Sequence, residues 1–339
     1  MKNTKVTVLM PVYNGEIYLK QAIESILHQT LSDFEFLIIN DGSTDASVEI
    51  IQSIKDPRIR LVHNKSNLTL VPTLNKGLEF ARGEYVARMD CDDISLPERL
   101  AKQVEFMDRF RDVGVCGTWV KTIGAIEGQI LKCPSDDATI RCGMLFNNML
   151  PHPSVIIRKK LIDTNSFRYN PDFRHAEDYE LWVRCAGYTH LANIDEVLLH
   201  YRCHERNISN RFKNEQHSSA NRIRRNLLKK LGIVPSHDEF EIHLSIAEHK
   251  YEIDKSFIAR LDAWLCKIKY ANNCNSCYSE PTFSKIIFNK WRKACYNATE
   301  LGWWTFKKYF HSPLSGKEKL TFKEKTRFAV KCFFKKVPS

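Results

Sequence analysis

The chain has 339 residues, of which 43% are hydrophobic, 11% aromatic and 27% charged. This globular composition excludes a disordered or fibrous protein, and the length allows one large domain with an extension or two domains. The net charge of +11 resides in residues 281–339, which hold fourteen Lys or Arg, three Glu and thirteen aromatic residues, whereas residues 1–280 balance to zero. This segment predicts either contact with an anionic surface (a membrane or nucleic acid) or a plain helical packing element.

Eleven cysteines are spread along the chain, and their odd number shows no pattern of a small disulfide-bonded domain. This usage predicts a reduced, cytoplasmic protein, with a peripheral position on the inner face of the cytoplasmic membrane as the alternative. Cys274 and Cys277 have Cys-x-x-Cys spacing, but no second pair completes a zinc site at the usual distance. The apolar run Val6–Val12 is too short for a secretion signal, and no stretch approaches the roughly 20 apolar residues of a membrane span.

The N-terminal part of the chain alternates between strand-like and helix-like patterns. Short apolar runs rich in β-branched residues predict buried strands, and apolar residues at helical spacing predict the helices between them. Ser95 and Glu98 predict a capping box for a further helix that runs to about Phe110. The expected strands are Val6–Val12, Phe34–Asn40, Ile59–His63 and Glu84–Asp90, and the expected helices are 16–29, one that opens at Ser43–Asp45, and 69–81.

The middle of the chain, residues 113–205, mixes strand-like pieces with a helix predicted over 177–186. Beyond about residue 212 the pattern is mostly helical. We therefore expect a catalytic domain over residues 1–212 and a helical, basic and aromatic extension over residues 213–339.

Repeated strand–helix–strand units predict an α/β fold with a mostly parallel sheet and helices on both faces. In such sheets ligands bind at the carboxyl ends of the strands. Polar side chains follow three of the expected strands at that end: Tyr13 with Asn14, Asn40 with Asp41, and Asp90 with its acidic neighbours. The agreement between periodicity and chemistry predicts a binding site at this edge of the sheet.

The strongest local signal is the motif Asp90-Cys91-Asp92-Asp93, directly after a buried strand. Three carboxylates in four residues repel one another, and a hard divalent cation such as Mn²⁺ or Mg²⁺ would compensate them while leaving room for phosphate oxygens. The alternative is an acidic loop in which Asp93 or Ser95 caps the following helix. We favour the metal site, because a cap does not explain Asp90 at the strand end.

Two other strand ends carry residues suited to a nucleoside. Asp41 can accept a hydrogen bond from a base N–H or a ribose hydroxyl, although a turn Asp also caps helices. Tyr13, in Pro11-Val12-Tyr13-Asn14, offers an aromatic face for stacking on a base, although it can equally pack in the core.

Two motifs farther along carry titratable groups. Glu177 and Asp178 stand at the start of a predicted helix, where a carboxylate acts as a general base or only favours the helix dipole. Arg202 and His204, in Tyr201-Arg202-Cys203-His204, can hold phosphate oxygens and ligate a metal, although an isolated His is usually structural. From these residues alone the structural interpretation is favoured for both motifs.

Taken together, these motifs resemble glycosyltransferase family 2, whose members have the GT-A fold. The resemblance extends over about residues 5–210, and four ordered motifs at the right separations make it specific. The matching segments are Val8–Gly15, Asn40–Asp45, Gly83–Asp93, Pro97–Leu100, Pro151–Ser154, Glu177–Asp178 and Tyr201–His204.

The resemblance implies an inverting transferase, in which a base removes the proton of an acceptor hydroxyl that attacks the anomeric carbon of a nucleotide sugar, most often UDP-linked. It implies donor-binding roles for Pro11, Tyr13, Asn14, Asp41, Arg88, Asp90 and Arg202. It also implies metal ligation by Asp92 and His204 with Mn²⁺ or Mg²⁺, acceptor contacts by His152 and Glu177, and general-base catalysis by Asp178.

One departure concerns the donor. Many relatives carry Arg-Asn in the helix before the acidic motif, whereas this chain has Leu74-Asn75. The donor contact of that Arg is therefore either absent or supplied by Lys76 or Arg88. Bacterial relatives with a basic, aromatic tail commonly build lipopolysaccharide, capsule or lipid-linked oligosaccharide, which implies a glycan or lipid-linked glycan acceptor.

Two alternatives belong to other functional classes. A nucleotidyltransferase acting on sugar phosphates also uses a parallel sheet and acidic metal ligands, but it needs a Gly-rich, basic loop after the first strand, and Met10–Tyr18 lacks one. A non-enzymatic nucleic-acid-binding protein would use the basic tail, but it leaves the acidic motif unexplained, so we expect no nucleic-acid partner. No P-loop, dinucleotide-binding Gly motif or nucleophile elbow is present in the sequence.

Overall fold

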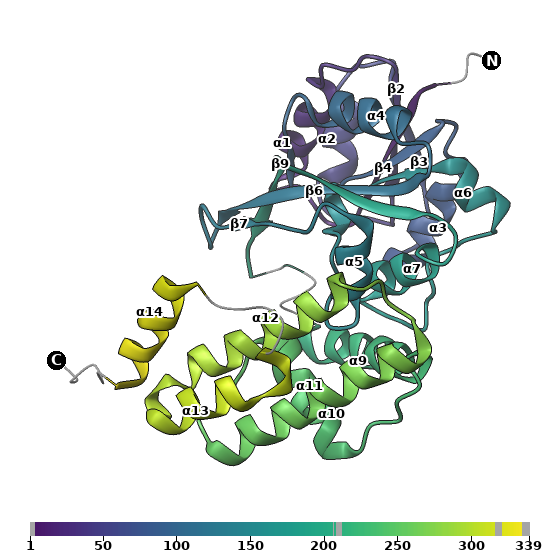
Figure 1. Ribbon diagram of the computed structural model, residues 1–339. Helices are drawn as coiled ribbons and strands as arrows, with labels where there is room; N and C mark the ends of the chain where they lie inside the picture. The colour runs from purple at the N-terminus through teal and green to yellow at the C-terminus, as the bar shows by residue number, and fades with distance from the viewer. Residues whose placement is uncertain (1–3, 206, 208–211, 316–320, 334–339) are drawn as a thin grey trace. The chain divides into compact units, whose positions relative to one another are not determined.

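The computed structural model describes residues 4–205, 207, 212–315 and 321–333 (Figure 1). The chain forms two compact units. The first contains Met1–Ile140 and Asn148–Ala220, and the second contains Arg141–Asn147 and Asn221–Ser339.

The described part of the first unit is built on one sheet, in the strand order β3-β2-β1-β4-β8-β6-β9-β5, with β7 paired to β6. The strands are β1 (Val6–Val12), β2 (Phe34–Asn40), β3 (Ile59–His63), β4 (Tyr85–Arg88), β5 (Ile94–Ser95), β6 (Val113–Gly124), β7 (Ile130–Leu131), β8 (Ile156–Arg158) and β9 (His190–Cys203). The four strands expected in the N-terminal part pair in parallel, as predicted. Beyond them the sheet is mixed, because β8 runs antiparallel to both β4 and β6 while β9 pairs with β6 in parallel.

Helices cover both faces of the parallel half of the sheet. The helices of the first unit are α1 (Leu19–Leu27), α2 (Ser47–Ser53), α3 (Leu70–Phe80), α4 (Arg99–Arg109), the first half of α5 (Asp137–Met144), α6 (Lys159–Thr164), α7 (Glu177–Cys185) and the start of α9 (Lys213–Lys230), with a 3₁₀ turn at His152–Ser154. Val8 and Met10 point to the face packed by α1, α2 and α4. On the other face α3 approaches β1 so closely that a Cβ on Gly77 would lie 2.3 Å from Leu9 Cδ1.

The predicted capping box of α4 is wrong. Glu98 is the N-cap residue, and its side chain makes no capping hydrogen bond. Ser95 instead belongs to the short strand β5, which pairs with β9, and its Oγ accepts a hydrogen bond from Gln29 Nε2 at 3.1 Å. Because Ser95 pairs within the sheet, it does not cap the helix, and α4 starts three residues later than the capping box would place it.

The second unit is helical, as the sequence predicts. Its helices are the rest of α9, α10 (His237–Glu248), α11 (Lys255–Asn275), α12 (Thr282–Asn297), α13 (Trp303–His311) and α14 (Phe322–Phe333), with 3₁₀ turns at Thr299–Leu301 and Pro313–Ser315. Its core contains fully buried Trp264, Trp291, Phe283 and Phe328.

Residues 141–147 are embedded in this helical unit although they come from the middle of the chain. Arg224 Nε donates to the carbonyl oxygen of Phe146 at 2.7 Å, and the ring of His243 hydrogen-bonds the carbonyl oxygen of Leu145 at 3.0 Å. The chain therefore enters and leaves the second unit once before it ends there.

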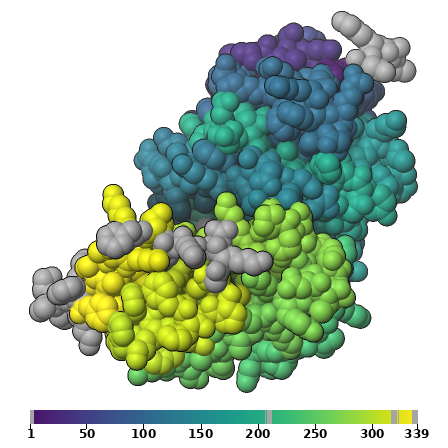
Figure 2. Space-filling view, in the orientation of Figure 1, coloured from purple at the N-terminus to yellow at the C-terminus, as the bar shows by residue number. Residues whose placement is uncertain are grey.

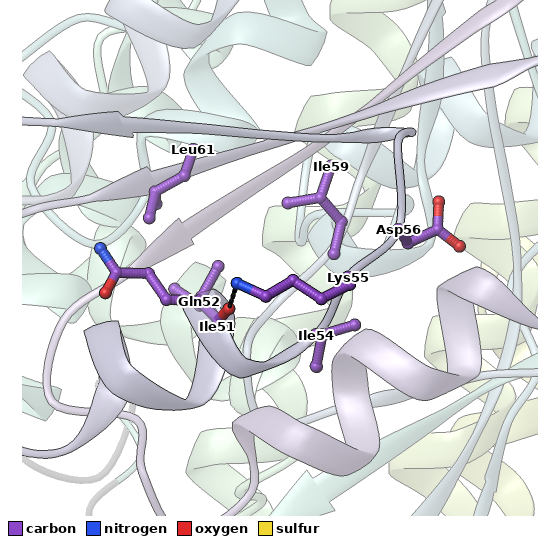
Figure 3. Close-up of a pocket in the computed structure, with 7 residues that line it drawn as sticks. All are labelled: Ile51, Gln52, Ile54, Lys55, Asp56, Ile59 and Leu61. Atoms are coloured by element: carbon purple, nitrogen blue, oxygen red, sulfur yellow. Dashed lines mark hydrogen bonds between the residues drawn. The ribbon is translucent and has the colours of Figure 1, made fainter.

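All eleven cysteines are free thiols. None of the helices in the described part of the chain is long and apolar enough to cross a bilayer. A surface hollow lies beside the edge strand β3 and helix α2 (Figure 3), and none of the predicted site residues lines it. Its lining residues are Ile51, Gln52, Ile54, Lys55, Asp56, Ile59 and Leu61.

Candidate active site

Asp41 is held rigidly at the carboxyl end of β2. Only 3% of the residue is exposed, and its Oδ1 accepts hydrogen bonds from Asn64 Nδ2 at 2.7 Å and from the backbone N–H of Leu68 at 2.8 Å. Lys76 Nζ donates to Asn64 Oδ1 at 2.7 Å. Asp41 therefore organises the loop after β3 and does not cap α2. The turn behind it requires Gly42, whose φ of +73° and close backbone neighbours exclude a Cβ.

The end of β1 presents an aromatic ring to solvent. Pro11 is buried in the strand, whereas Tyr13 is 49% exposed, which argues against core packing for this ring. Asn14 has a positive φ of 52°, and its Oδ1 accepts from the backbone N–H of Thr44 at 2.8 Å. Strands β1 and β2 are paired up to Val12 and Asn40, so these groups and Asp41 share one edge of the sheet.

The acidic motif forms a tight turn after β4. Carboxylate oxygens of Asp90, Asp92 and Asp93 lie within 4.8 Å of one another. Asp93 is 1% exposed; its Oδ1 accepts from the backbone N–H of Arg202 at 2.8 Å, while its Oδ2 has no hydrogen-bond partner among the described residues. Burial, and then the charges of Asp90 and Asp92, raise the pKa of Asp93 well above its usual range. Negative charge is thus concentrated here beyond what the turn itself can stabilise.

Three cationic or basic side chains surround this turn. Arg88 forms an ion pair with Asp90. Burial is the largest single influence and lowers the pKa of Arg88, but the charge and hydrogen bond of Asp90 together with the charges of Tyr169 and Asp93 outweigh it, so the net shift is upward. Arg99 is fully buried and donates to the carbonyl oxygen of Arg88 at 2.6 Å; burial lowers its pKa to about 9. His204 Nε2 lies 2.9 Å from Asp92 Oδ2.

The end of β9 is tied to the acidic turn by several bonds. Arg202 Nε donates to the carbonyl oxygen of Asp92 at 2.7 Å, and its guanidinium lies 4.4 Å from the ring centroid of Tyr18. Asn207 Nδ2 donates to the carbonyl oxygen of Arg202 at 3.0 Å and approaches Asp92 Oδ2 at 3.4 Å. The predicted pair Arg202 and His204 is therefore brought to the predicted acidic motif from more than a hundred residues away.

The donor set of this turn fits a hard divalent cation. Carboxylate oxygens with one imidazole nitrogen are ligands that Mn²⁺ and Mg²⁺ accept, and Asp93 Oδ2 is a buried oxygen without a partner in the described structure. Burial, and then Asp90, raise the pKa of Asp92, against the hydrogen bond with His204. A bound cation would relieve this repulsion.

The start of α7 holds a second acidic cluster of a different kind. Asp178 Oδ2 accepts from Asn148 Nδ2 at 2.7 Å, and its Oδ1 accepts from the backbone N–H of Tyr179 at 2.7 Å. Burial raises the pKa of Asp178 to about 6, although these hydrogen bonds oppose the shift. Glu177 is 4% exposed, its Oε2 has no hydrogen-bond partner among the described residues, and burial followed by the charge of Asp178 raises its pKa to about 7.

Arg88 links the two acidic clusters. Its positive charge acts on Asp90 and Asp93 on one side and on Glu177 and Asp178 on the other. Its Nε is buried and has no hydrogen-bond partner in the described structure. An anionic group that entered between the clusters would meet this donor.

His152 lies beside the second cluster as a neutral base. Its Nε2 lies 3.0 Å from the Tyr169 hydroxyl, and its ring centroid lies 6.1 Å from that of Trp182. Burial, followed by the charge of Arg88, lowers the pKa of His152 well below its usual range. All twelve residues singled out in the sequence thus lie at the strand-end edge or around the two clusters linked by Arg88.

The sequence offered little sign of the residues that hold these groups in place. Asn148 and Tyr169 belong to no recognised motif. Arg99 lies within the matching segment Pro97–Leu100, but nothing in the sequence indicated its role. Asn75, which matches the Asn of the relatives' Arg-Asn pair, exchanges two hydrogen bonds with the backbone of Tyr169 at 2.8 and 2.9 Å. Asn207 stands three residues after His204.

Comparison with known proteins decides the family. A sequence model described as "Glycosyl transferase family 2" matches residues 7–140. An uncharacterized glycosyltransferase of Haemophilus influenzae is 34% identical over 244 residues, which make up 67% of this chain and 76% of the relative. The chain belongs to glycosyltransferase family 2. The protein is therefore a glycosyltransferase, which decides against the nucleotidyltransferase and the non-enzymatic alternatives.

Family 2 relatives include the amylovoran biosynthesis glycosyltransferase AmsE of Erwinia amylovora, 34% identical over 203 residues, or 58% of this chain and 75% of AmsE. S. aureus TarS 1–349 in complex with UDP-GlcNAc superposes with a TM-score of 0.57 at 18% identity, covering 87% of this chain and 89% of that chain. Mannosyltransferase PcManGT of Pyrobaculum calidifontis, in complex with GDP-Man and Mn²⁺, gives a TM-score of 0.53 at 14% identity, covering 98% and 86%. These likenesses concern the fold, and they confirm the predicted GT-A fold.

Proposed function

We propose that this family 2 enzyme is an inverting, metal-dependent glycosyltransferase that moves a sugar from a nucleotide diphosphate donor, UDP-linked, to a hydroxyl of a glycan acceptor. The observation that carries the proposal is the pair of acidic clusters joined by Arg88. One cluster is suited to a cation and a diphosphate, and the other holds a carboxylate that can take a proton near neutral pH.

The nucleoside would bind at the edge formed by β1 and β2. Tyr13 offers a solvent-exposed ring for stacking on the base, and Asp41 lies at the base of the same edge with its carboxylate oriented by Asn64. Asn14 and Pro11 fix the chain beside them. The complexes of TarS with UDP-GlcNAc and UDP support a uridine donor, while that of PcManGT with GDP-Man leaves guanosine as the competing donor class.

The diphosphate would lie against the acidic turn. Asp92 and His204 would hold Mn²⁺ or Mg²⁺ with help from Asp90, and the cation would neutralise charge on the leaving nucleotide. Arg88 and Arg202 add fixed positive charge, and the unpartnered Nε of Arg88 can donate to a phosphate or sugar oxygen. Lys76 is hydrogen-bonded to Asn64 beside Asp41, so Arg88 is the better placed of the two to replace the missing Arg at the diphosphate.

Asp178 would act as the general base. The acceptor hydroxyl gives its proton to the Asp178 carboxylate while its oxygen bonds to the anomeric carbon, and the bond from that carbon to the diphosphate breaks with its electrons on the diphosphate. Asn148 and the N–H of Tyr179 orient the carboxylate for this transfer. Glu177 and neutral His152 line the same cluster and would bind acceptor hydroxyls.

The acceptor class is proposed from the chemistry and the relatives together. A single displacement requires an acceptor with a free hydroxyl, which a glycan offers, and AmsE is an amylovoran biosynthesis glycosyltransferase. We therefore propose lipopolysaccharide, capsule or lipid-linked oligosaccharide synthesis in bacteria, in the cytoplasm or at the inner face of its membrane.

The test is nucleotide release from a panel of UDP- and GDP-sugars with Mn²⁺ and then with EDTA, with Asp92→Ala and Asp178→Ala run beside the wild type. Metal-dependent release from one donor, absent in both variants, is the expected result and would name the sugar. If no nucleotide is released because the true acceptor is not in the assay, the enzyme should still bind its nucleotide. Calorimetric titration with UDP and with GDP in the presence of Mn²⁺ measures this binding. Binding of neither nucleotide would contradict the proposal.

A further inference from the structure

Helices α13 and α14 turn an unusual set of side chains outward. Trp303 is 49% exposed, Phe310 39%, Val330 47% and Phe333 49%. These two helices carry four of the exposed large hydrophobic side chains of the described chain, although each has an inner face that already packs. The residues of α13 and α14 form part of the outer surface in Figure 2, where they appear in yellow.

The outward side chains touch one another across the two helices. The ring centroids of Trp303 and Phe333 lie 5.1 Å apart, those of Trp303 and Phe306 5.2 Å, and those of Phe306 and Phe310 4.8 Å. We call Trp303, Phe306, Phe310, Val330 and Phe333 the aromatic patch. Monomeric proteins seldom expose such a continuous group of large apolar side chains without a use for it.

The aromatic patch is not required to close the helical core. The inner faces of the two helices are already filled by Tyr309, Phe328 and Cys332, which are at most 3% exposed. Tyr309 stacks with Trp291 and packs against Phe328 at 5.1 Å. The outward rings therefore remain available to something outside the chain.

Positive charge borders the aromatic patch. Six Lys or Arg and one Glu lie within α13 and α14, and that Glu324 is engaged by Arg292 at 3.5 Å and by Thr321. Lys323, Arg327 and Lys331 follow each other at i, i+4 spacing and are all exposed, so they form a basic row beside Val330 and Phe333. Lys307 Nζ lies 5.4 Å from the Trp303 ring.

We propose that the aromatic patch and its basic border form a docking surface for an anionic phospholipid bilayer. Trp and Phe side chains with neighbouring Lys and Arg are the composition of a surface that lies in the headgroup region, with the rings at the acyl boundary and the cations among the phosphates. The described helices offer no membrane span, so the contact is peripheral.

Charge and ring geometry favour lipid over two other occupants. A second copy of the chain facing this patch would bring the two basic borders together. A nucleic acid needs free ring faces for its bases, whereas the Trp303 ring is stacked by Phe306 at an interplanar angle of 12° and approached by Lys307. The inference is independent of the sugar transferred, and it would bring the enzyme to a lipid-linked acceptor.

Deletion of residues 281–339 is a poor test, because it removes Phe283, Ile287 and Trp291 of α12, which are fully buried. Surface substitutions in the full-length protein are sharper. The apolar variant is Trp303→Ser with Phe333→Ser, and the charge variant is Lys307→Glu with Lys331→Glu. Matched controls in the same unit are Val234→Ser with Tyr270→Ser, which are 83% and 71% exposed outside the patch, and Lys285→Glu for charge.

Binding is measured by co-sedimentation with vesicles of phosphatidylcholine, with and without phosphatidylglycerol, at rising salt. The wild type should bind the anionic vesicles only, and less as salt rises. The apolar variant and the charge variant should each weaken binding by about tenfold, while the controls bind as the wild type does. Circular dichroism melting checks that the variants are folded, and calorimetry with UDP and Mn²⁺ checks the transfer site separately.

Four outcomes would overturn the inference: no wild-type binding, equal binding to neutral vesicles, equal losses in controls and patch variants, or binding that the patch variants retain in full. Sedimentation velocity and a fluorescent RNA or DNA duplex test the rival occupants. A dimer or a nucleic-acid complex that the patch variants lose, without vesicle binding by the wild type, would assign the patch to that partner instead.

Discussion

The first unit contains two acidic clusters that are balanced in different ways. Asp90 is paired with Arg88, His204 Nε2 lies 2.9 Å from Asp92 Oδ2, and the charges of Arg88 and Arg99 act on Asp93. Asp178 accepts hydrogen bonds from an amide and a backbone N–H, and the charge of Arg88 also acts on it, but burial is the dominant influence and raises its pKa. Glu177, its neighbour, has an oxygen with no partner among the described residues.

One fold thus places carboxylates in two environments that suit two different chemical roles. Carboxylates that repel one another are suited to bind a cation, and the guanidinium groups beside them are suited to bind a charged diphosphate. A buried carboxylate with weak partners has its pKa raised toward neutrality, which suits it to accept a proton. Substitutions at Asp178, Arg88 and Glu177 can separate these two roles.

The largest effect is expected at Asp178, where a substitution should affect the chemical step and not nucleotide binding. We expect Asp178→Asn to lower kcat by about a thousandfold, because it removes the proton acceptor, and to change nucleotide affinity by less than about twofold. Steady-state kinetics and calorimetry measure the two quantities. Glu180→Gln on the same helix is the control, since Glu180 is paired with Arg184 and should leave both unchanged. Retained kcat in Asp178→Asn would remove the base from this position.

The link between the clusters is tested at Arg88. Arg88→Met should lower the free energy of unfolding by about 3 kcal/mol, because it leaves Asp90 and Asp93 without their buried counter-charge. Urea denaturation measures this. Added Mn²⁺ should recover more stability in the variant than in the wild type, since the cation takes over the compensation. An unchanged free energy of unfolding would mean that Arg88 does not stabilise the acidic turn.

At Glu177 a substitution is expected to raise the free energy of unfolding, by less than the Arg88 substitution lowers it. Its folded pKa of about 7 lies above its unfolded value, so the stability it contributes is present at low pH and is lost as pH rises through about 7. Glu177→Gln should therefore stabilise the protein at pH 8, by about 1 kcal/mol, and have little effect at pH 4. Denaturation at the two pH values provides the comparison, and destabilisation at pH 8 would contradict it.

The smallest effect concerns the acid limb of the pH–rate profile. Activity should fall as pH drops through about 6, where Asp178 becomes protonated. Glu177, with a pKa of about 7, is mostly protonated at this midpoint, so Glu177→Gln should leave the midpoint in place. Asn148→Leu removes a donor to Asp178 and should move the midpoint up by about half a pH unit. An unchanged midpoint in Asn148→Leu would mean that the midpoint belongs to another group.

Much of the first unit follows from local sequence patterns. The strands Val6–Val12 and Phe34–Asn40 were predicted to the residue, because buried parallel strands are continuous apolar runs with polar residues directly after them. The edge strand Ile59–His63 was also predicted to the residue, although it is only partly buried. The same rule predicted a site at the strand ends. The roles of the site residues themselves remain predictions until the variants are measured.

The features that the sequence predicted wrongly or not at all depend on contacts between distant segments of the chain. Ser95 looked like a cap, but pairing with β9 claims it, and no local pattern shows that partner. The antiparallel direction of β8 also has no local signal, because it is set by where a loop returns the chain. Asn148 lies thirty residues before Asp178, so only the folded chain could reveal that its amide orients that carboxylate.

The passage of residues 141–147 through the helical unit has a consequence for how the gene can be divided. Leu145 and Phe146 are completely enclosed there, and Arg224 and His243 hold their backbone. A gene cut after the last residue of the first unit would leave these two side chains with nothing to cover them. The two units are thus not modules that recombination could exchange at a single breakpoint, and variation between relatives should reach the helical unit as point changes more often than as whole replacements.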